Sequence, residues 1–138
     1  MTDKYYFDTS IWIDLIEDRK GYHDEPLGKY ASMLVLKILT NKENLVMSDI
    51  VLEELRRRVA DHTINSMLNP LKHQILKVFP GRGQLQEASH LSITRKIPIG
   101  DALHAILSRD NNLILVTRDN DFKKLLDITN YHKPEDLL

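Results

Sequence analysis

The run LILV at 113–116 constrains the fold more than any other stretch, because every residue in it is apolar. A short apolar run without polar alternation is typical of a strand that is covered on both faces, as in parallel sheets packed between helices. The chain then continues with TRDNDF, which puts carboxylates directly after the buried strand. Any proposed fold has to account for acidic residues at that position.

Other short apolar runs alternate with helical patterns along the chain. We predict strands at 4–8, 45–47 and 113–116, and an extended piece that begins at Ile128. Polar stretches predict loops at 17–28 and 80–83, and Pro70 is expected to break or kink the helical pattern around it. Helical spacing or capping residues predict helices over 11–16, 31–39, 48–58, 64–78, 85–95, 101–110 and 119–126.

This alternation predicts an α/β protein, a three-layer α/β/α sandwich around a short central parallel sheet. With 138 residues and 42% hydrophobic residues, we expect one domain over residues 1–138. No run approaches the roughly 18 apolar residues that span a bilayer, and MTDKYYFDTS has no apolar leader, so we expect a cytoplasmic protein without a membrane partner. The absence of cysteine excludes disulfides and thiolate zinc sites.

Acidic residues stand where the predicted strands end. Asp8 ends the first strand, and Asp119 lies just past the strand at 113–116. Because the carboxyl ends of parallel strands share an edge, the two carboxylates would meet if the strands are neighbours. They would then raise each other's pKa unless a cation neutralises them. The alternative is that both residues, and Asp101 in GDALHAIL, only cap helices, each stabilising by about 1 kcal/mol.

Glu54 is the fourth acidic candidate, in SDIVLEELRRR. On a helix it stands four residues after Ile50 and borders the inward face, whereas Glu53 should face water. The alternative is a helix-surface pair of Glu54 with Arg57 or Arg58.

These motifs, taken in order, resemble the PIN-domain family. They are DTSIW after the first strand, S-x-x-x-x-x-EL, DALHA, and TRDNDF after LILV, and the resemblance runs from Tyr5 to the closing KPEDLL. Within the family, the chain looks like the small prokaryotic ribonucleases that include VapC-type toxins. The resemblance implies an acidic cluster that binds Mg²⁺ or Mn²⁺ and hydrolyses RNA, formed by Asp8, Glu54, Asp101 and Asp119. Asp121 falls on a position that sometimes assists.

The chemistry is consistent with that implication, since Mg²⁺ prefers oxygen ligands and is commonly held by carboxylates together with substrate phosphate. We expect Asp8 and Asp119 to be the firmest ligands, with Asp101 and Glu54 positioning the attacking water.

Several polar residues are candidates for a supporting role. Ser10 and Thr117 are expected to hydrogen-bond the carboxylates or a phosphate, and local capping is the alternative. Basic side chains are candidates for contacting RNA phosphates, although such runs are also typical of a solvated surface. They are Arg56, Arg57, Arg58 and Arg118, with Lys123 and Lys124 nearby.

Two features depart from the family pattern. His104 stands where an aliphatic or small residue is common, one turn from Asp101. We interpret it as a partly exposed helix histidine, and lining of the cleft is the alternative. The segment from Arg19 to Tyr30 is longer than in compact members, which leaves the choice of partner open.

Together these features predict a metal-dependent endoribonuclease, the toxin of a toxin–antitoxin pair. The resemblance implies an antitoxin partner and a homodimer. One alternative is a catalytically silent PIN-like scaffold that binds RNA or protein. Another is a receiver-type phosphoryl-transfer module, but that class needs an early acidic pair and a late lysine, where this chain has DTS and TRD.

Overall fold

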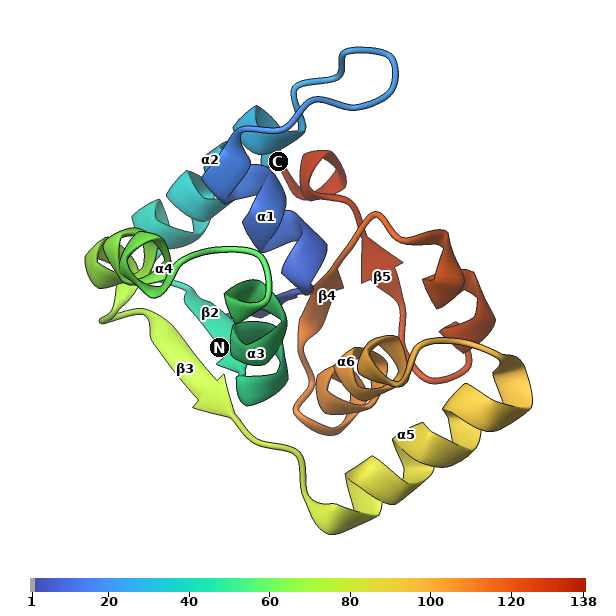
Figure 1. The fold of residues 1–138 in the computed structure, drawn as a ribbon. Coiled ribbons are helices and arrows are strands. Elements are labelled where there is room, and N and C mark those ends of the chain that lie inside the picture. The colour runs from blue at the N-terminus through green and yellow to red at the C-terminus, as the bar shows by residue number, and fades with distance from the viewer. Residues whose placement is uncertain (1) are drawn as a thin grey trace.

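The computed structural model describes residues 2–138 and has a five-stranded sheet at its centre (Figure 1). The strands are β1 (Lys4–Phe7), β2 (Asn44–Ser48), β3 (Ile75–Val78), β4 (Ile114–Val116) and β5 (Tyr131–His132). Their order is β3-β2-β1-β4-β5, and every neighbouring pair is parallel. The predicted parallel sheet is therefore confirmed, and β1 and β4 are indeed neighbours.

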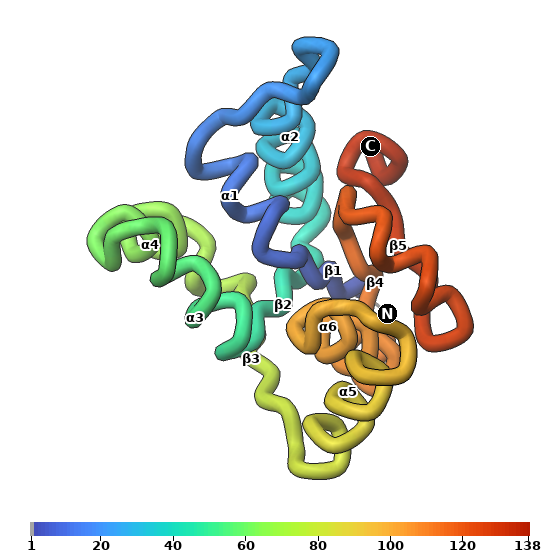
Figure 2. The backbone as a smooth tube through the Cα atoms, turned by 45° about the vertical axis from the view of Figure 1, so that its right-hand side comes forward, coloured from blue at the N-terminus to red at the C-terminus, as the bar shows by residue number. Residues whose placement is uncertain are grey.

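Helices cover both faces of this sheet. Figure 2 shows α1 and α2 on one side and α5 and α6 on the other, so the three-layer α/β/α arrangement is also confirmed. Within residues 2–138, no helix is long and apolar enough to cross a membrane. The α-helices are α1 (Thr9–Glu17), α2 (Leu27–Thr40), α3 (Asp49–Arg56), α4 (Asp61–Leu68), α5 (Arg82–Arg95) and α6 (Ile99–Asp110), and the 3₁₀ helices are η1 (Asn69–Leu71), η2 (Asn120–Leu125) and η3 (Pro134–Leu137).

The core lies where these helices pack on the three central strands. Tyr6 and Phe7 of β1 are fully buried, and so are Leu115 and Val116 of β4. Trp12 of α1 packs against Phe7 with ring centroids 5.1 Å apart. Each fully buried large apolar side chain contributes roughly 1.5–3 kcal/mol of transfer free energy, so burial of the central strands stabilises the fold.

The predicted helix over 64–78 is wrong in its second half. Helix α4 ends at Leu68 and the 3₁₀ helix η1 follows around Pro70, where the break was expected, but Ile75–Val78 is strand β3 rather than helix. Ile75 and Val78 are three residues apart, a spacing that also fits a helix face. The backbone of this segment instead pairs with β2, which satisfies its polar groups along a sheet edge.

Three other boundaries differ from expectation. Helix α6 begins at Ile99, two residues before Asp101, so this aspartate lies in the first turn and does not cap the helix. The segment after Asp119 is the 3₁₀ helix η2, and the last strand begins at Tyr131 rather than Ile128.

At the carboxyl edge of the sheet, β1, β2 and β4 are each followed by a helix, after three intervening residues in the case of β4. Asp8 caps α1 by accepting a hydrogen bond from Ile11 N at 3.2 Å, and Asp119 caps η2 in the same way. Ser48 caps α3. The capping interpretation therefore holds for Asp8 and Asp119. Because β1 lies between β2 and β4, these three helix starts are adjacent in space.

Candidate metal centre

A cleft of about 250 Å³ opens at this edge of the sheet. Its lining brings together the four acidic residues singled out in the sequence, which come from the starts of α1, α6 and η2 and from the last turn of α3. They are Asp8, Glu54, Asp101 and Asp119, joined by Thr9, Ser10, His104 and Arg58 among others. Segments up to 111 residues apart in the chain thus contribute carboxylates to one site.

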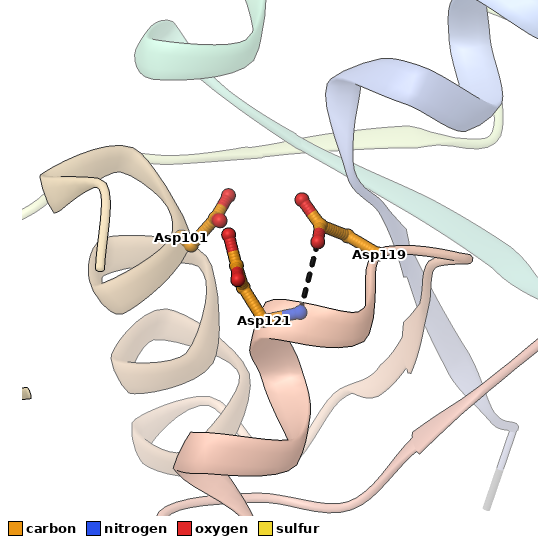
Figure 3. A group of neighbouring side chains, drawn as sticks. All are labelled: Asp101, Asp119 and Asp121. Atoms are coloured by element: carbon orange, nitrogen blue, oxygen red, sulfur yellow. Dashed lines mark hydrogen bonds between the residues drawn. The ribbon is translucent and has the colours of Figure 1, made fainter. Parts of the chain in front are cut away.

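Three carboxylates form a tighter group. Asp101, Asp119 and Asp121 each offer an oxygen, and these oxygens lie within 4.8 Å of one another. Figure 3 shows Asp101 reaching from α6 toward the two aspartates at the start of η2, where Asp119 accepts a hydrogen bond from Asp121 N at 2.9 Å. Asp121, expected only to assist, lies in this group, whereas Asp8 does not.

The pKa of Asp101 lies well above its ordinary value. Burial and the charge of Asp119 raise its pKa from 3.8 to about 7, and His104 opposes that rise. Its Oδ2 atom is buried and has no hydrogen-bond partner within residues 2–138. A buried oxygen of this kind normally finds a donor or a cation.

Asp8 is held rigidly at the end of β1 and is only 4% exposed. Its Oδ1 accepts from Ser10 Oγ at 2.6 Å and from Ile11 N, and its Oδ2 accepts from Thr117 Oγ1 at 2.5 Å. Burial raises its pKa, and the two hydroxyl donors act against that rise. Because a carboxylate has about four acceptor positions, these three bonds leave one for a cation.

Glu54 reaches the cleft from α3. Its Oε1 accepts from Thr9 Oγ1 at 3.1 Å and lies 3.0 Å from His104 Nε2. Burial raises its pKa, but the hydrogen bond from His104 and the other favourable contacts outweigh burial, so the net direction is downward. Arg58 pairs with Glu17 instead of Glu54, which excludes the helix-surface pair of Glu54 with Arg58.

The interpretation of His104 as a partly exposed residue is wrong, because it is only 2% exposed. It lies on α6 one turn after Asp101, and its ring faces β1, where Tyr6 OH is 2.7 Å from Nδ1. The available signal was its i+3 spacing from Asp101, which places both side chains on one helix face.

The candidate RNA-binding arginines differ in whether acidic side chains of the protein already pair with them. Arg118 makes a bidentate pair with Glu135 at 2.6 and 2.8 Å and lies near the buried Asp14, so its guanidinium is held by the fold. Arg56 and Arg58 make ion pairs on the surface, with Asp61 and Glu17 respectively.

Arg57 is exposed and lines a second groove, of about 540 Å³. Glu54 and Asp101 line both this groove and the acidic cleft. The groove also contains apolar side chains, including Ile50, Leu85 and Ile99, so it offers both charged and apolar surface beside the cleft.

The residues of the cleft fit a divalent cation of the Mg²⁺ or Mn²⁺ type. The donors are carboxylate oxygens, which hard cations prefer. A positive charge at this place would offset the burial and the charge of Asp119 that raise the pKa of Asp101, and it would give the buried Asp101 Oδ2 a partner.

Several solved structures share this fold. VapBC2 from Rickettsia felis, bound to a DNA fragment from its promoter, aligns with TM-score 0.65 and 19% identity, over 94% of this chain and 98% of that one. VapBC-1 from nontypeable Haemophilus influenzae gives 0.66 and 19%, over 96% and 98%. A toxin–antitoxin complex from Klebsiella pneumoniae gives 0.62 and 18%, over 94% and 97%.

No curated protein sequence matches the chain significantly. The family model for the PIN domain, however, matches residues 5–126, which include β2, β3, β4, all of β1 except Lys4, and every carboxylate of the cleft. The chain belongs to the PIN domain family.

Proposed function

We propose that this protein is a divalent-metal-dependent endoribonuclease that hydrolyses phosphodiester bonds in RNA. The observation that carries the proposal is the convergence of carboxylates from separate segments on one cleft, where Asp101 Oδ2 is buried and finds no partner in the described part of the chain. A catalytically silent scaffold accounts poorly for this convergence, since it gains nothing from crowded acids whose repulsion destabilises the fold.

The aspartates divide the work by their position. Asp101, Asp119 and Asp121 are close enough together to hold Mg²⁺ or Mn²⁺, and Asp8 has one acceptor position left toward the same cleft. When bound, the ion would activate a water for in-line attack at phosphorus and stabilise the charge on the leaving oxygen. Ser10 and Thr117 hold the Asp8 carboxyl group in place and favour its ionised form by donating hydrogen bonds to it.

Glu54 and Asp101 line the boundary between the cleft and the second groove. We assign both residues to the cation site, where they would also orient the attacking water that the cation holds, as expected from the sequence. The exposed Arg57 is suited to bind a backbone phosphate, and the apolar side chains of Leu85 and Ile99 are suited to contact bases. Arg118 is a weaker candidate for RNA contact because Glu135 already binds its guanidinium.

The biological role that we propose is that of a toxin controlled by an antitoxin protein in the cytoplasm. It is supported by the family and by the origin of similar folds in VapBC and other toxin–antitoxin complexes. A homodimer remains a prediction from the family resemblance.

Cleavage of a mixed RNA pool tests the enzymatic proposal. The chain should cut RNA with Mg²⁺ or Mn²⁺, and both EDTA and Asp8→Asn should abolish the products. Asp127→Asn is the matched control, since it makes the same change at an exposed residue away from the cleft. Equal cleavage by the unchanged chain and Asp8→Asn would point to a contaminating nuclease and refute the assignment.

Induced expression tests the toxin role separately. Growth should stop on induction of the unchanged chain and continue on induction of Asp8→Asn at the same protein level. If expression is harmless although the protein cleaves RNA in vitro, the nuclease assignment stands and the toxin role is refuted.

A further inference from the structure

A series of buried hydrogen bonds links Ser48, Tyr6 and His104 to Glu54. The first three of these residues have no role in the chemistry described so far. Ser48 Oγ lies 2.7 Å from Tyr6 OH, which lies 2.7 Å from His104 Nδ1. His104 Nε2 in turn lies 3.0 Å from Glu54 Oε1. Tyr6, Ser48 and His104 are 0%, 1% and 2% exposed, so water does not compete for these bonds.

The direction of donation follows from the residue at the end of the chain. An ionised Glu54 only accepts, so His104 Nε2 carries the proton and donates to it. In the neutral imidazole Nδ1 then accepts, and the Tyr6 hydroxyl donates to it. Ser48 Oγ accepts from Val51 N at 3.2 Å and is free to donate to the Tyr6 oxygen. With His104 in this tautomer, every polar group of the series from Ser48 to Glu54 has a hydrogen-bond partner.

We propose that His104 is a positioning residue for the cation site: held in its Nε2–H tautomer by Tyr6, it fixes the carboxylate of Glu54. Thr9 donates to the same oxygen, Oε1, so the two donors together leave Oε2 for the cation or for water. The proposal rests on the metal-dependent function stated above and adds a residue that controls cation affinity without touching the cation.

The expected size of the effect follows from similar support elsewhere. Removing a hydrogen-bond partner of a metal-binding side chain typically lowers metal affinity by about 10- to 100-fold. A histidine that only filled space would be replaceable by another side chain of similar size without such a loss.

Two substitutions at His104 separate these roles. Gln can place an amide donor near the position of Nε2, facing Glu54, whereas Asn places its amide near Nδ1, facing Tyr6. With Mn²⁺ as the titrant in calorimetry on the full chain, His104→Asn should weaken binding by about 10- to 100-fold, and His104→Gln should stay much closer to the unchanged protein. Equal losses in both variants, or a loss in neither, would overturn the positioning role.

A second pair of variants tests the hydrogen bond between Tyr6 and His104, which does not include Glu54 itself. Tyr6→Phe removes the donor to His104 Nδ1, and Tyr5→Phe removes the neighbouring hydroxyl, which instead faces Glu43 at 3.5 Å. Nitrogen-15 NMR of the imidazole in the metal-free protein should show the Nε2–H tautomer. Tyr6→Phe should reduce its population and weaken Mn²⁺ binding, while Tyr5→Phe should change neither.

The outcomes distinguish this inference from the proposed function. An Nδ1–H tautomer in the unchanged protein, or the same Mn²⁺ affinity in Tyr6→Phe and Tyr5→Phe, would overturn the positioning role and leave the metal site standing. If the unchanged chain does not bind Mn²⁺ at all, the metal-dependent function fails and the positioning role fails with it.

Discussion

Replacing Asp101 by asparagine should stabilise the metal-free protein while removing a candidate metal ligand. Burial and Asp119 raise the pKa of Asp101 from 3.8 to about 7, although His104 opposes this. The folded chain therefore keeps the Asp101 proton to a higher pH than the unfolded chain does. The free energy of unfolding consequently falls as pH rises from about 4 to about 7, and the full penalty persists above that range.

The magnitude follows from the size of the pKa change. Each pH unit corresponds to about 1.4 kcal/mol, so a rise of about three gives roughly 4 kcal/mol. Asp101 is only partly buried, and halving this value for solvent screening leaves about 2 kcal/mol. Asparagine cannot ionise, so Asp101→Asn should be more stable than the unchanged chain by about 2 kcal/mol at pH 8, equivalent to roughly 5–8 °C in Tm.

Thermal unfolding in EDTA at pH 5 and pH 8 measures this difference. At pH 5 the advantage of Asp101→Asn should shrink to roughly a third of its value at pH 8. Asp136→Asn, at an exposed aspartate, is the control and should show no such dependence. Added Mn²⁺ should raise the Tm of the unchanged chain more than that of Asp101→Asn. An equal or lower Tm for Asp101→Asn at pH 8 would refute the view that burial and the charge of Asp119 make ionised Asp101 unfavourable in the folded protein.

Three further substitutions are informative. Thr117→Val removes the hydroxyl that donates to Asp8 Oδ2. Urea unfolding should show that the free energy of unfolding falls by about 1–3 kcal/mol, and by more at pH 8 than at pH 5. A loss that does not depend on pH would contradict this prediction. Gly28→Ala should lower the Tm, because the added Cβ would lie 2.5 Å from Asp18 Cα. Gly83 lies in helix α5, where an added Cβ would meet no other part of residues 2–138 within 4 Å, so Gly83→Ala should instead stabilise the fold by about 0.4–1 kcal/mol. A change of stability in the same direction for both glycine variants would refute this steric reasoning.

Local patterns were sufficient where a segment's conformation depends on its own residues. The apolar run of β4 and the aromatic run of β1 predicted buried strands, and capping residues such as Ser48 predicted where a helix starts. The segment Ile75–Val78 defeated this approach, since its apolar spacing fits a helix and only pairing with β2 makes it a strand. Strand pairing depends on residues about 30 positions away, which no local window contains.

The sequence by itself determined the α/β architecture and the order of the acidic motifs. It also predicted that acidic residues meet at one edge of the sheet, because the carboxyl ends of parallel strands share an edge. Only the tertiary structure decided which groups meet there: Asp121 joins Asp101 and Asp119, Glu135 binds Arg118, and His104 is buried between Tyr6 and Glu54. Each of these contacts joins elements that are distant in the chain and is set by how the helices pack on the sheet. Side-chain spacing along one element gives no information about the partner that packing brings from another.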